Sequence, residues 1–301
     1  MISKNQMLRK QTQNKPNSNP NKPNYKKAKI NVSFVKTKEY ENICLNRQAE
    51  NKPNQTQLQT QANGFFKRLP PLPIEKLMKI CSAADGAKVL RMDIKTFILG
   101  DYQTNSYCLT ADASAADCLI IDTGLRSEPL IDYLKTNSLN PVAAVFTHGH
   151  IDHIDGLSLL RKNWPDIKVA IHKADAAMFE DGKLNLSVFS GIPFKTSPAE
   201  IIIETDGPMT FAGMKFQVLH TPGHTPGGIS LYSEKEGVVF VGDALFAGSV
   251  GRTDFPGGDY NQLITSIKSK LLTLLDDTRV YSGHGPVTTI IGEKRTNPFL
   301  Q

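Results

Sequence analysis

The stretch Thr147-His148-Gly149-His150-Ile151-Asp152-His153 follows directly on the apolar segment PVAAVF, at residues 141–146. It places three of the seven histidines of the chain, together with an aspartate, within six residues. A short apolar run that is bounded by turn residues is typical of a buried strand. Imidazole nitrogens and carboxylate oxygens are the ligands that zinc and iron bind in proteins. The stretch therefore predicts a metal site at the end of a strand.

Three later clusters have the same arrangement of an expected strand, a metal-binding side chain and a glycine. They are VLHTPGHTPGG with His220 and His224, VVFVGD with Asp243, and VYSGHG with His284. Glycine lets the backbone approach a ligand closely or adopt a turn that other residues avoid. His172 also ends an expected strand, but no glycine or acidic residue adjoins it, and we interpret it as a non-ligand. The role of His220 stays open, because it lies four residues before His224 in the same loop.

The order of the expected elements predicts an α/β protein. Hydrophobic patterns predict strands within residues 92–99, 105–110, 118–124, 141–148, 167–171, 214–220, 228–232, 237–243 and 279–285. Helical spacing of apolar residues predicts helices within 127–138, 156–164 and 261–275. Scattered Gly, Ser and Pro predict a long loop over 181–199. Open α/β sheets bind their ligands at strand ends, where the polar clusters of this sequence lie.

Charge and composition separate the beginning of the chain from the rest. Residues 1–70 carry 14 Lys and Arg against 3 Asp and Glu, whereas the remaining residues carry 21 against 26. The early part is rich in Asn, Gln, Lys and Pro and repeats the tetrapeptide NKPN, so it offers little apolar surface to bury. We expect residues 1–88 to be a disordered extension and residues 89–301 to form one domain. The acidic balance of that domain argues against a nucleic-acid partner.

The cysteines and the hydropathy pattern indicate the cellular compartment of the protein. The four cysteines show no CxxC pair and no spacing typical of a small disulfide-bonded domain, which is usual in a reducing compartment. No apolar run reaches the roughly 18 residues that a membrane span needs, and residues 1–29 contain no apolar core of a signal peptide. We expect a cytoplasmic protein with no membrane partner. The sequence leaves its oligomeric state open.

The motifs HxHxDH, PGHTPG, VGD and GHG, in this order, resemble the metallo-β-lactamase superfamily over roughly residues 93–300. The resemblance implies a four-layer αββα sandwich with a metal cleft at one edge of its two sheets. It also implies two divalent metal ions, with zinc favoured and iron or manganese as alternatives. One metal would be held by His148, His150 and His224, the other by Asp152, His153 and His284, and Asp243 would bridge both.

The segments FAGSVGRTDFPGGD and YSGHGPVTTIIGEKRTNPFL resemble the small glyoxalase II-like hydrolases of bacteria. This resemblance implies a small-molecule substrate, either a thioester such as an S-acylglutathione or a related ester. Metal-bound hydroxide would attack it, since such sites lower the pKa of bound water toward ~7, and Asp152 would orient the hydroxide as the catalytic residue. Full-length glyoxalase II grips glutathione with a C-terminal helical domain, whereas 17 residues follow His284 here. We therefore expect S-lactoylglutathione itself to be a poor substrate.

Arg252 takes the place of a substrate-binding lysine of glyoxalase II, so it is a candidate for binding an anionic group of the substrate. A structural ion pair between Arg252 and Asp254 is the alternative. The main alternative function is a mono-iron persulfide dioxygenase of the same fold, which shares HxHxDH and a GRTDF segment but tends to have an AHDY-like sequence where this chain has residues 282–285. Lactonases and other ester hydrolases are a second alternative. The acidic domain disfavours RNase Z-like nucleases, and the seven filled ligand positions disfavour a non-catalytic binding protein.

Overall fold

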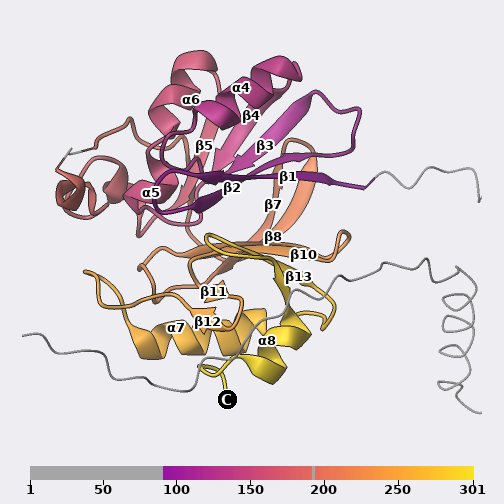
Figure 1. Ribbon diagram of the computed structural model, residues 1–301, viewed down its shortest axis with the longest axis vertical. Coiled ribbons are helices and arrows are strands. Elements are labelled where there is room, and N and C mark those ends of the chain that lie inside the picture. Colours follow the sequence, from indigo (N-terminus) through magenta and orange to yellow (C-terminus); the bar gives the residue numbers. More distant parts are fainter. Residues whose placement is uncertain (1–90, 192–193) are drawn as a thin grey trace, which may run out of the picture. The chain divides into compact units, whose positions relative to one another are not determined.

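Two six-stranded β-sheets lie face to face, and helices cover the outer face of each (Figure 1). The computed structural model describes residues 91–191 and 194–301. The extension predicted over residues 1–88, and the predicted start of the domain at residue 89, lie outside the described residues. Within them, the layers are helix, sheet, sheet and helix, which confirms the predicted α/β class and the αββα sandwich.

The first sheet has the strand order β1-β2-β3-β4-β5-β6. Its strands span Asp93–Leu99 (β1), Thr104–Thr110 (β2), Asp117–Ile121 (β3), Asn140–Val145 (β4), Lys168–His172 (β5) and Ile201–Ile203 (β6). Strands β1 to β3 pair antiparallel, whereas β3 to β6 pair parallel. Because the parallel strands run in one direction, the segments that follow β3, β4 and β5 meet at the same edge of the sheet.

The second sheet has the order β14-β13-β10-β9-β8-β7. Its strands span Gly207–Phe211 (β7), Met214–His220 (β8), Ile229–Ser233 (β9), Val238–Gly242 (β10), Arg279–Ser282 (β13) and Thr288–Thr289 (β14). Strand β13 pairs parallel with β10, and β9 pairs antiparallel with both β8 and β10. Strands β8, β10 and β13 therefore share one direction, and their carboxyl ends reach a common edge. Leu245–Phe246 (β11) and Ser249–Val250 (β12) form a separate hairpin beyond β10.

The helices divide between the two sheets (Figure 1). On the first-sheet side lie Glu128–Thr136 (α4), Ile151–Ile154 (α5) and Leu157–Asn163 (α6), with the 3-10 turns Ala176–Phe179 (η2) and Ser187–Ser190 (η3) nearby in sequence. On the second-sheet side lie Tyr260–Ser266 (α7), its π-helical continuation Ile267–Leu271 (η4) and Ile290–Thr296 (α8). Among the described residues, no helix has both the length and the apolar character that crossing a membrane requires.

The alternation of side chains along the strands produces three separate apolar layers. Ile120 and Ala144 face the helices α4 and α6, whereas their neighbours Leu119 and Val145 face the second sheet. In the second sheet, Phe240 faces the first sheet, and the residues on either side of it pack against α7, η4 and α8. Successive residues of a strand point to opposite faces, so strands that are apolar throughout are buried on both sides. This is why the runs CLII, VAAV and VVFV are continuous rather than alternating.

Every strand and helix that the sequence predicts is present, but several short elements are additional. Strands β6 and β14 and helices α5 and α8 are only two to seven residues long, and such lengths give a weak periodic signal. Strand β7 contains Gly207 and Pro208, which are tolerated because it lies at the edge of its sheet. The helix predicted over 261–275 is an α-helix only to Ser266. The segment predicted as a long loop over 181–199 is irregular in its described part except for η3.

Phe240 gives a direct test of the packing between the sheets. Its side chain is completely buried, and its ring centroid lies 5.1 Å from those of Tyr107 and Tyr281. Phe240→Ala should lower the free energy of unfolding by about 3–5 kcal/mol, because it removes a large buried side chain from a rigid interface. Urea unfolding followed by circular dichroism measures this. Leu275→Ala, at a side chain that is 57% exposed, is the control and should change stability by less than about 0.5 kcal/mol. A loss below about 1 kcal/mol for Phe240→Ala would contradict this packing.

Candidate metal centre

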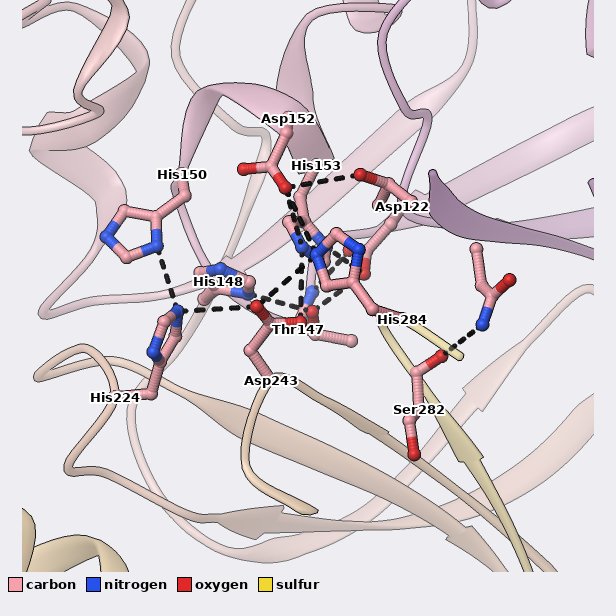
Figure 2. A network of polar contacts seen from close by, with 12 residues as sticks. Asp122, Thr147, His148, His150, Asp152, His153, His224, Asp243, Ser282 and His284 are labelled. Atoms are coloured by element: carbon pink, nitrogen blue, oxygen red, sulfur yellow. Dashed lines mark hydrogen bonds and ion pairs between the residues drawn. The ribbon is translucent and has the colours of Figure 1, made fainter. Parts of the chain in front are cut away.

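All seven predicted ligands meet at one edge of the two sheets (Figure 2). The first sheet contributes four of them from the segment after β4, which continues into the short helix α5. The second sheet contributes the other three from the segments after β8, β10 and β13. These residues are, in chain order, His148, His150, Asp152, His153, His224, Asp243 and His284. The common direction of the strands in each sheet brings them together, although up to 136 positions separate them in sequence.

His148, His150 and His224 form the first group of potential ligands. One ring nitrogen of each lies within 4.8 Å of the others, and the three side chains are buried. Their rings are nearly perpendicular to one another, with centroids 4.7–4.8 Å apart, so they meet edge to face instead of stacking. His150 Nδ1 and His224 Nε2 lie only 3.0 Å apart. Three imidazoles converging on one point in this way can hold a single cation between them.

Asp152, His153 and His284 form the second group, and Asp243 lies between the two groups. Asp152 Oδ2 lies 3.2 Å from His284 Nε2 and 3.6 Å from His153 Nε2. One oxygen of Asp243 lies 3.4 Å from His153 Nε2, and the other lies 3.6 Å from His224 Nε2 in the first group. The Asp243 carboxylate therefore contacts both groups, which is the position that the bridging prediction requires (Figure 2).

Unpartnered polar atoms show that the cluster fits metal ions. His148 Nε2, His153 Nε2 and Asp243 Oδ1 are buried and have no hydrogen-bond partner among the described residues. A buried polar atom without a partner costs about 1–3 kcal/mol, so several in one place call for a ligand. The donor set consists of imidazole nitrogens and carboxylate oxygens, which suits zinc, iron or manganese. Seven donors around two neighbouring points fit two divalent ions.

The protonation of the first group also favours a metal. Burial, followed by the neighbouring imidazoles His153, His150 and His224, lowers the pKa of His148 well below its ordinary value. Burial likewise lowers the pKa of His150 to about 3. These rings are therefore neutral near pH 7, and neutral imidazole is the form that binds metals.

In the second group, the pKa values of the two histidines are raised instead of lowered. Burial opposes the charging of His153, but the carboxylates of Asp152, Asp122 and Asp243 outweigh it and raise its pKa well above the ordinary value. Burial is likewise outweighed at His284, where hydrogen bonds to Asp152 and Asp243 raise the pKa to about 10. Protons on these imidazoles thus compensate the buried carboxylates when no cation is present. Metal binding here must displace protons, which makes affinity increase with pH.

Hydrogen bonds from outside the cluster orient the ligands. Asp122 Oδ2 accepts a hydrogen bond from His153 Nδ1 at 2.8 Å and another from Thr147 Oγ1 at 2.7 Å. His224 Nδ1 donates to the carbonyl oxygen of Arg252 at 2.7 Å, and His284 Nδ1 to that of Tyr102 at 3.0 Å. Each contact occupies one ring nitrogen and directs the other nitrogen into the cluster, as is usual around metal sites.

Asp175 connects loops that come from the two sheets. Its buried carboxylate accepts hydrogen bonds from Gly149 N at 3.2 Å and from Thr225 Oγ1 at 2.7 Å through Oδ2, and from Gly227 N at 2.6 Å through Oδ1. Gly149 separates two ligand histidines of the first sheet, and Thr225 directly follows His224 of the second. Asp175 therefore sets the spacing within the first group of ligands.

Asp122 and Asp175 lie outside the motifs that predict the site. Asp122 follows a buried strand and precedes a glycine by two positions, so the pattern that identified Asp243 could have drawn attention to it. Asp175 offers no comparable signal, because its partners are backbone and hydroxyl groups about 26 and 50 positions away.

The remaining histidines lie apart from the seven. The ring of His172 stacks on that of His220, with centroids 4.1 Å apart and planes inclined by 12°. His220 Nε2 lies 2.9 Å from the carbonyl oxygen of Pro226. Among the described residues, neither belongs to a group of convergent ligand atoms. His220, which the sequence left open, is thus bound to the backbone of its own loop.

Arg252 makes the contact that the sequence analysis named as the alternative to substrate binding. Its guanidinium pairs with both carboxylate oxygens of Asp254, each at 2.7 Å. It also lies over the ring of Phe255, 3.9 Å from the centroid. Arg252 nevertheless lines the cavity above the metal cluster.

Comparison with known proteins agrees with this geometry. Residues 99–284 match the family model described as the Metallo-beta-lactamase superfamily. This chain belongs to the metallo-β-lactamase superfamily. It is 41% identical to a probable metallo-hydrolase of Bacillus subtilis (strain 168), YqgX, over 67% of this chain and 94% of that protein. It is 37% identical to the hydroxyacylglutathione hydrolase GloC of Haemophilus influenzae, over 69% of this chain and 98% of that protein.

Two solved structures extend the comparison within this superfamily. The structure named BLEG-1 B3 metallo-beta-lactamase is 42% identical, with a TM-score of 0.67, over 69% of this chain and all of that one. TTHA1623 in a di-iron-bound form is 37% identical, with a TM-score of 0.59, over 68% of this chain and all of that one. The superfamily relationship and the fold are thus supported by sequence and by structure.

Metal content tests the position of Asp243. Asp243→Ala should lose most of both metals, because its carboxylate contacts both groups of ligands. His172→Ala is the matched control and should keep the wild-type content, because its ring lies outside the cluster. Elemental analysis of gel-filtered protein, with circular dichroism to verify folding, measures both. Full metal content in a folded Asp243→Ala variant would contradict the bridging position.

Asp175→Asn tests the connection between the two ligand loops. An amide has only one acceptor oxygen, so one of the three buried donors loses its partner, at a cost of about 1–3 kcal/mol of stability. Zinc affinity should also fall about 10-fold, as it does when partners of metal ligands are altered. Competition with a chromogenic chelator measures the affinity, and urea unfolding of the metal-free protein measures the stability. Asp166→Asn, at an exposed carboxylate, is the control. A zinc affinity of Asp175→Asn within twofold of wild type would rule out this positioning role.

Proposed function

We propose that this protein is a dinuclear metal hydrolase that cleaves a thioester, such as an S-acylglutathione, or a related ester. The observation that carries the proposal is the second group of ligands, Asp152, His153 and His284, placed beside Asp243 with its ligand atoms within 4.8 Å of one another. We further propose that the metals are zinc and that the protein acts on a small molecule in the cytoplasm.

The second group supports a hydrolase over the mono-iron dioxygenase. A mono-iron oxygenase needs a facial set of three ligands with open positions, which His148, His224 and Asp243 could supply. Such an enzyme would have no second metal ion for Asp152, His153 and His284 to bind. In this structure that group is buried or half-buried, and hydrogen bonds to Asp122 and to the carbonyl oxygen of Tyr102 orient its two imidazoles. Asp152 and His153 belong to HxHxDH, which both functions share, so His284 within residues 282–285 is the member of the group that favours the hydrolase.

Different parts of the site would have different roles in hydrolysis. When bound, the metals would supply a nucleophile at neutral pH by lowering the pKa of water and would stabilise the charge that develops on the substrate. Thr104 Oγ1 donates a hydrogen bond to Asp152 Oδ2 at 3.2 Å, which fixes that carboxylate beside His284. Asp152 also lines the cavity, so it can accept a hydrogen bond from the attacking water and orient it toward the substrate.

The composition of the cavity favours a thioester over an amide. Apart from the proposed ligands and Arg252, the described residues that line it offer only the hydroxyl groups of Tyr102 and Ser249, and hydroxyl groups are weaker acids than carboxyl or imidazolium groups. An amine leaving group needs a donated proton, whereas a thiolate departs without one. The name of the relative GloC, a hydroxyacylglutathione hydrolase, is consistent with a thioester. The relative TTHA1623 has been solved in a di-iron-bound form, which keeps iron, besides manganese, as an alternative to zinc.

Paired assays test the proposed function. The zinc-loaded protein should release thiol from S-lactoylglutathione or from a simple acyl thioester, and it should consume no oxygen. His284→Ala should lower kcat about 100-fold or more by removing a ligand of the second group, and His172→Ala should not. The iron-loaded protein is tested in parallel with glutathione persulfide in an oxygen electrode. Oxygen uptake with persulfide, together with no cleavage of any thioester or ester, would overturn the proposal.

A further inference from the structure

The cavity above the metal cluster is mainly apolar, with Ser249 and Arg252 as the polar side chains of its lining beyond the cluster and the hydroxyl group of Tyr102. It has a volume of about 490 Å³, within the range of sites for small molecules. Its walls beyond the ligands consist mainly of aromatic and aliphatic side chains. Six of them are Tyr102, Leu186, Phe189, Phe246, Val250 and Phe255.

These side chains reach the cavity from four separate segments. Tyr102 lies in the turn between β1 and β2, and Leu186 and Phe189 lie before and in η3. Phe246 and Val250 belong to the hairpin β11–β12, and Phe255 lies in the segment after it. Phe189 is 77% exposed and Tyr102 59% exposed, although both are large and apolar in character. Exposed aromatic groups that converge on one cavity from several segments indicate a surface that binds an apolar group.

The charges of the cavity do not match glutathione. A glutathione thioester carries two carboxylates and one ammonium group. Among the described residues that line the cavity, Arg252 is the one cationic side chain besides the histidines of the cluster. Its guanidinium is already paired in bidentate fashion with Asp254, and one face lies on Phe255. Asp254 neutralises the guanidinium through Nε and Nη2, so a substrate carboxylate that approached the remaining Nη1 would be repelled by the charge of Asp254.

We infer that the substrate carries an uncharged, apolar group on the carbonyl carbon or on the leaving thiol, and that this group packs against Phe189, Phe246 and their neighbours in the cavity. This inference rests on the proposed hydrolysis of a thioester or ester. It narrows the substrate to apolar acyl thioesters and esters, and it makes glutathione an unnecessary part of the substrate.

A matched set of thioesters tests the inference. Acetyl, butyryl and hexanoyl thioesters are prepared both with N-acetylcysteamine, which is uncharged, and with glutathione, and release of free thiol is followed. For the uncharged series, kcat/KM should rise at least about 10-fold from acetyl to hexanoyl, because each added methylene finds apolar contact. The hexanoyl thioester of glutathione should be cleaved no faster than that of N-acetylcysteamine. A flat response to chain length, or a preference of more than about 10-fold for glutathione, would overturn this inference alone. Cleavage of none of the six compounds would overturn the proposed function as well.

Two variants test whether the preference for long acyl chains arises from the cavity. Phe189→Ser should lower kcat/KM for the hexanoyl thioester about 10-fold while changing that for acetyl less than threefold. Val188→Ser is the matched control, because Val188 lies beside Phe189 in η3 but does not line the cavity. Equal losses for acetyl and hexanoyl thioesters in Phe189→Ser would contradict the assignment.

Arg252→Gln tests the charge argument separately. Because the guanidinium is held by Asp254, this variant should change the ratio of kcat/KM between the glutathione and N-acetylcysteamine thioesters less than threefold. Loss of the glutathione reaction alone, by about 10-fold, would show that Arg252 binds the glutathione carboxylate and would overturn the inference.

Discussion

The carboxylate of Asp243 lies between imidazoles that come from opposite sheets, and its side chain is only 12% exposed. A buried carboxylate is costly unless positive charge lies beside it. Without metal, that charge must come from protons on His153 and His284; with metal, it comes from the ions themselves. The position of the Asp243 carboxylate restricts which residues can lie beside it. A side chain at Gly283 would overlap the Asp243 carboxylate, and one at Gly242 would overlap Thr147, so the glycines of GHG and VGD are requirements of close approach.

The αββα sandwich is what makes this arrangement rigid. Backbone hydrogen bonds join a ligand segment of each sheet to a strand of the other sheet, from Ile229 N in β9 to Thr147 O at 2.8 Å and from Asn105 N in β2 to Gly283 O at 2.7 Å. Asp175 adds a side-chain connection between the same loops. Backbone contacts between the sheets therefore support the positions of the ligands. Such preorganisation lets buried donors converge without the flexibility that would allow them to turn away.

The sequence predicts the part of this structure that depends on local pattern. The strands CLII, VAAV and VVFV are apolar throughout because both of their faces are covered, and a polar residue at the end of such a strand is an easily recognised signal. Helix α5 was missed because four residues carry too little periodicity, yet it is the element that carries Asp152 and His153 of the second group. The hydrogen bond that Gly227 N donates to Asp175 and the pairing of Arg252 within the cavity depend on three-dimensional contacts. The sequence could offer Arg252–Asp254 only as one of two alternatives.

The central claim is that two metal ions share Asp243. Anomalous diffraction from crystals of zinc-loaded protein, measured on both sides of the zinc absorption edge, tests it most directly. We expect two anomalous peaks, one among His148, His150 and His224 and the other among Asp152, His153 and His284, with Asp243 between them. A single peak at the first group, with none at the second in a crystal grown with excess zinc, would contradict it.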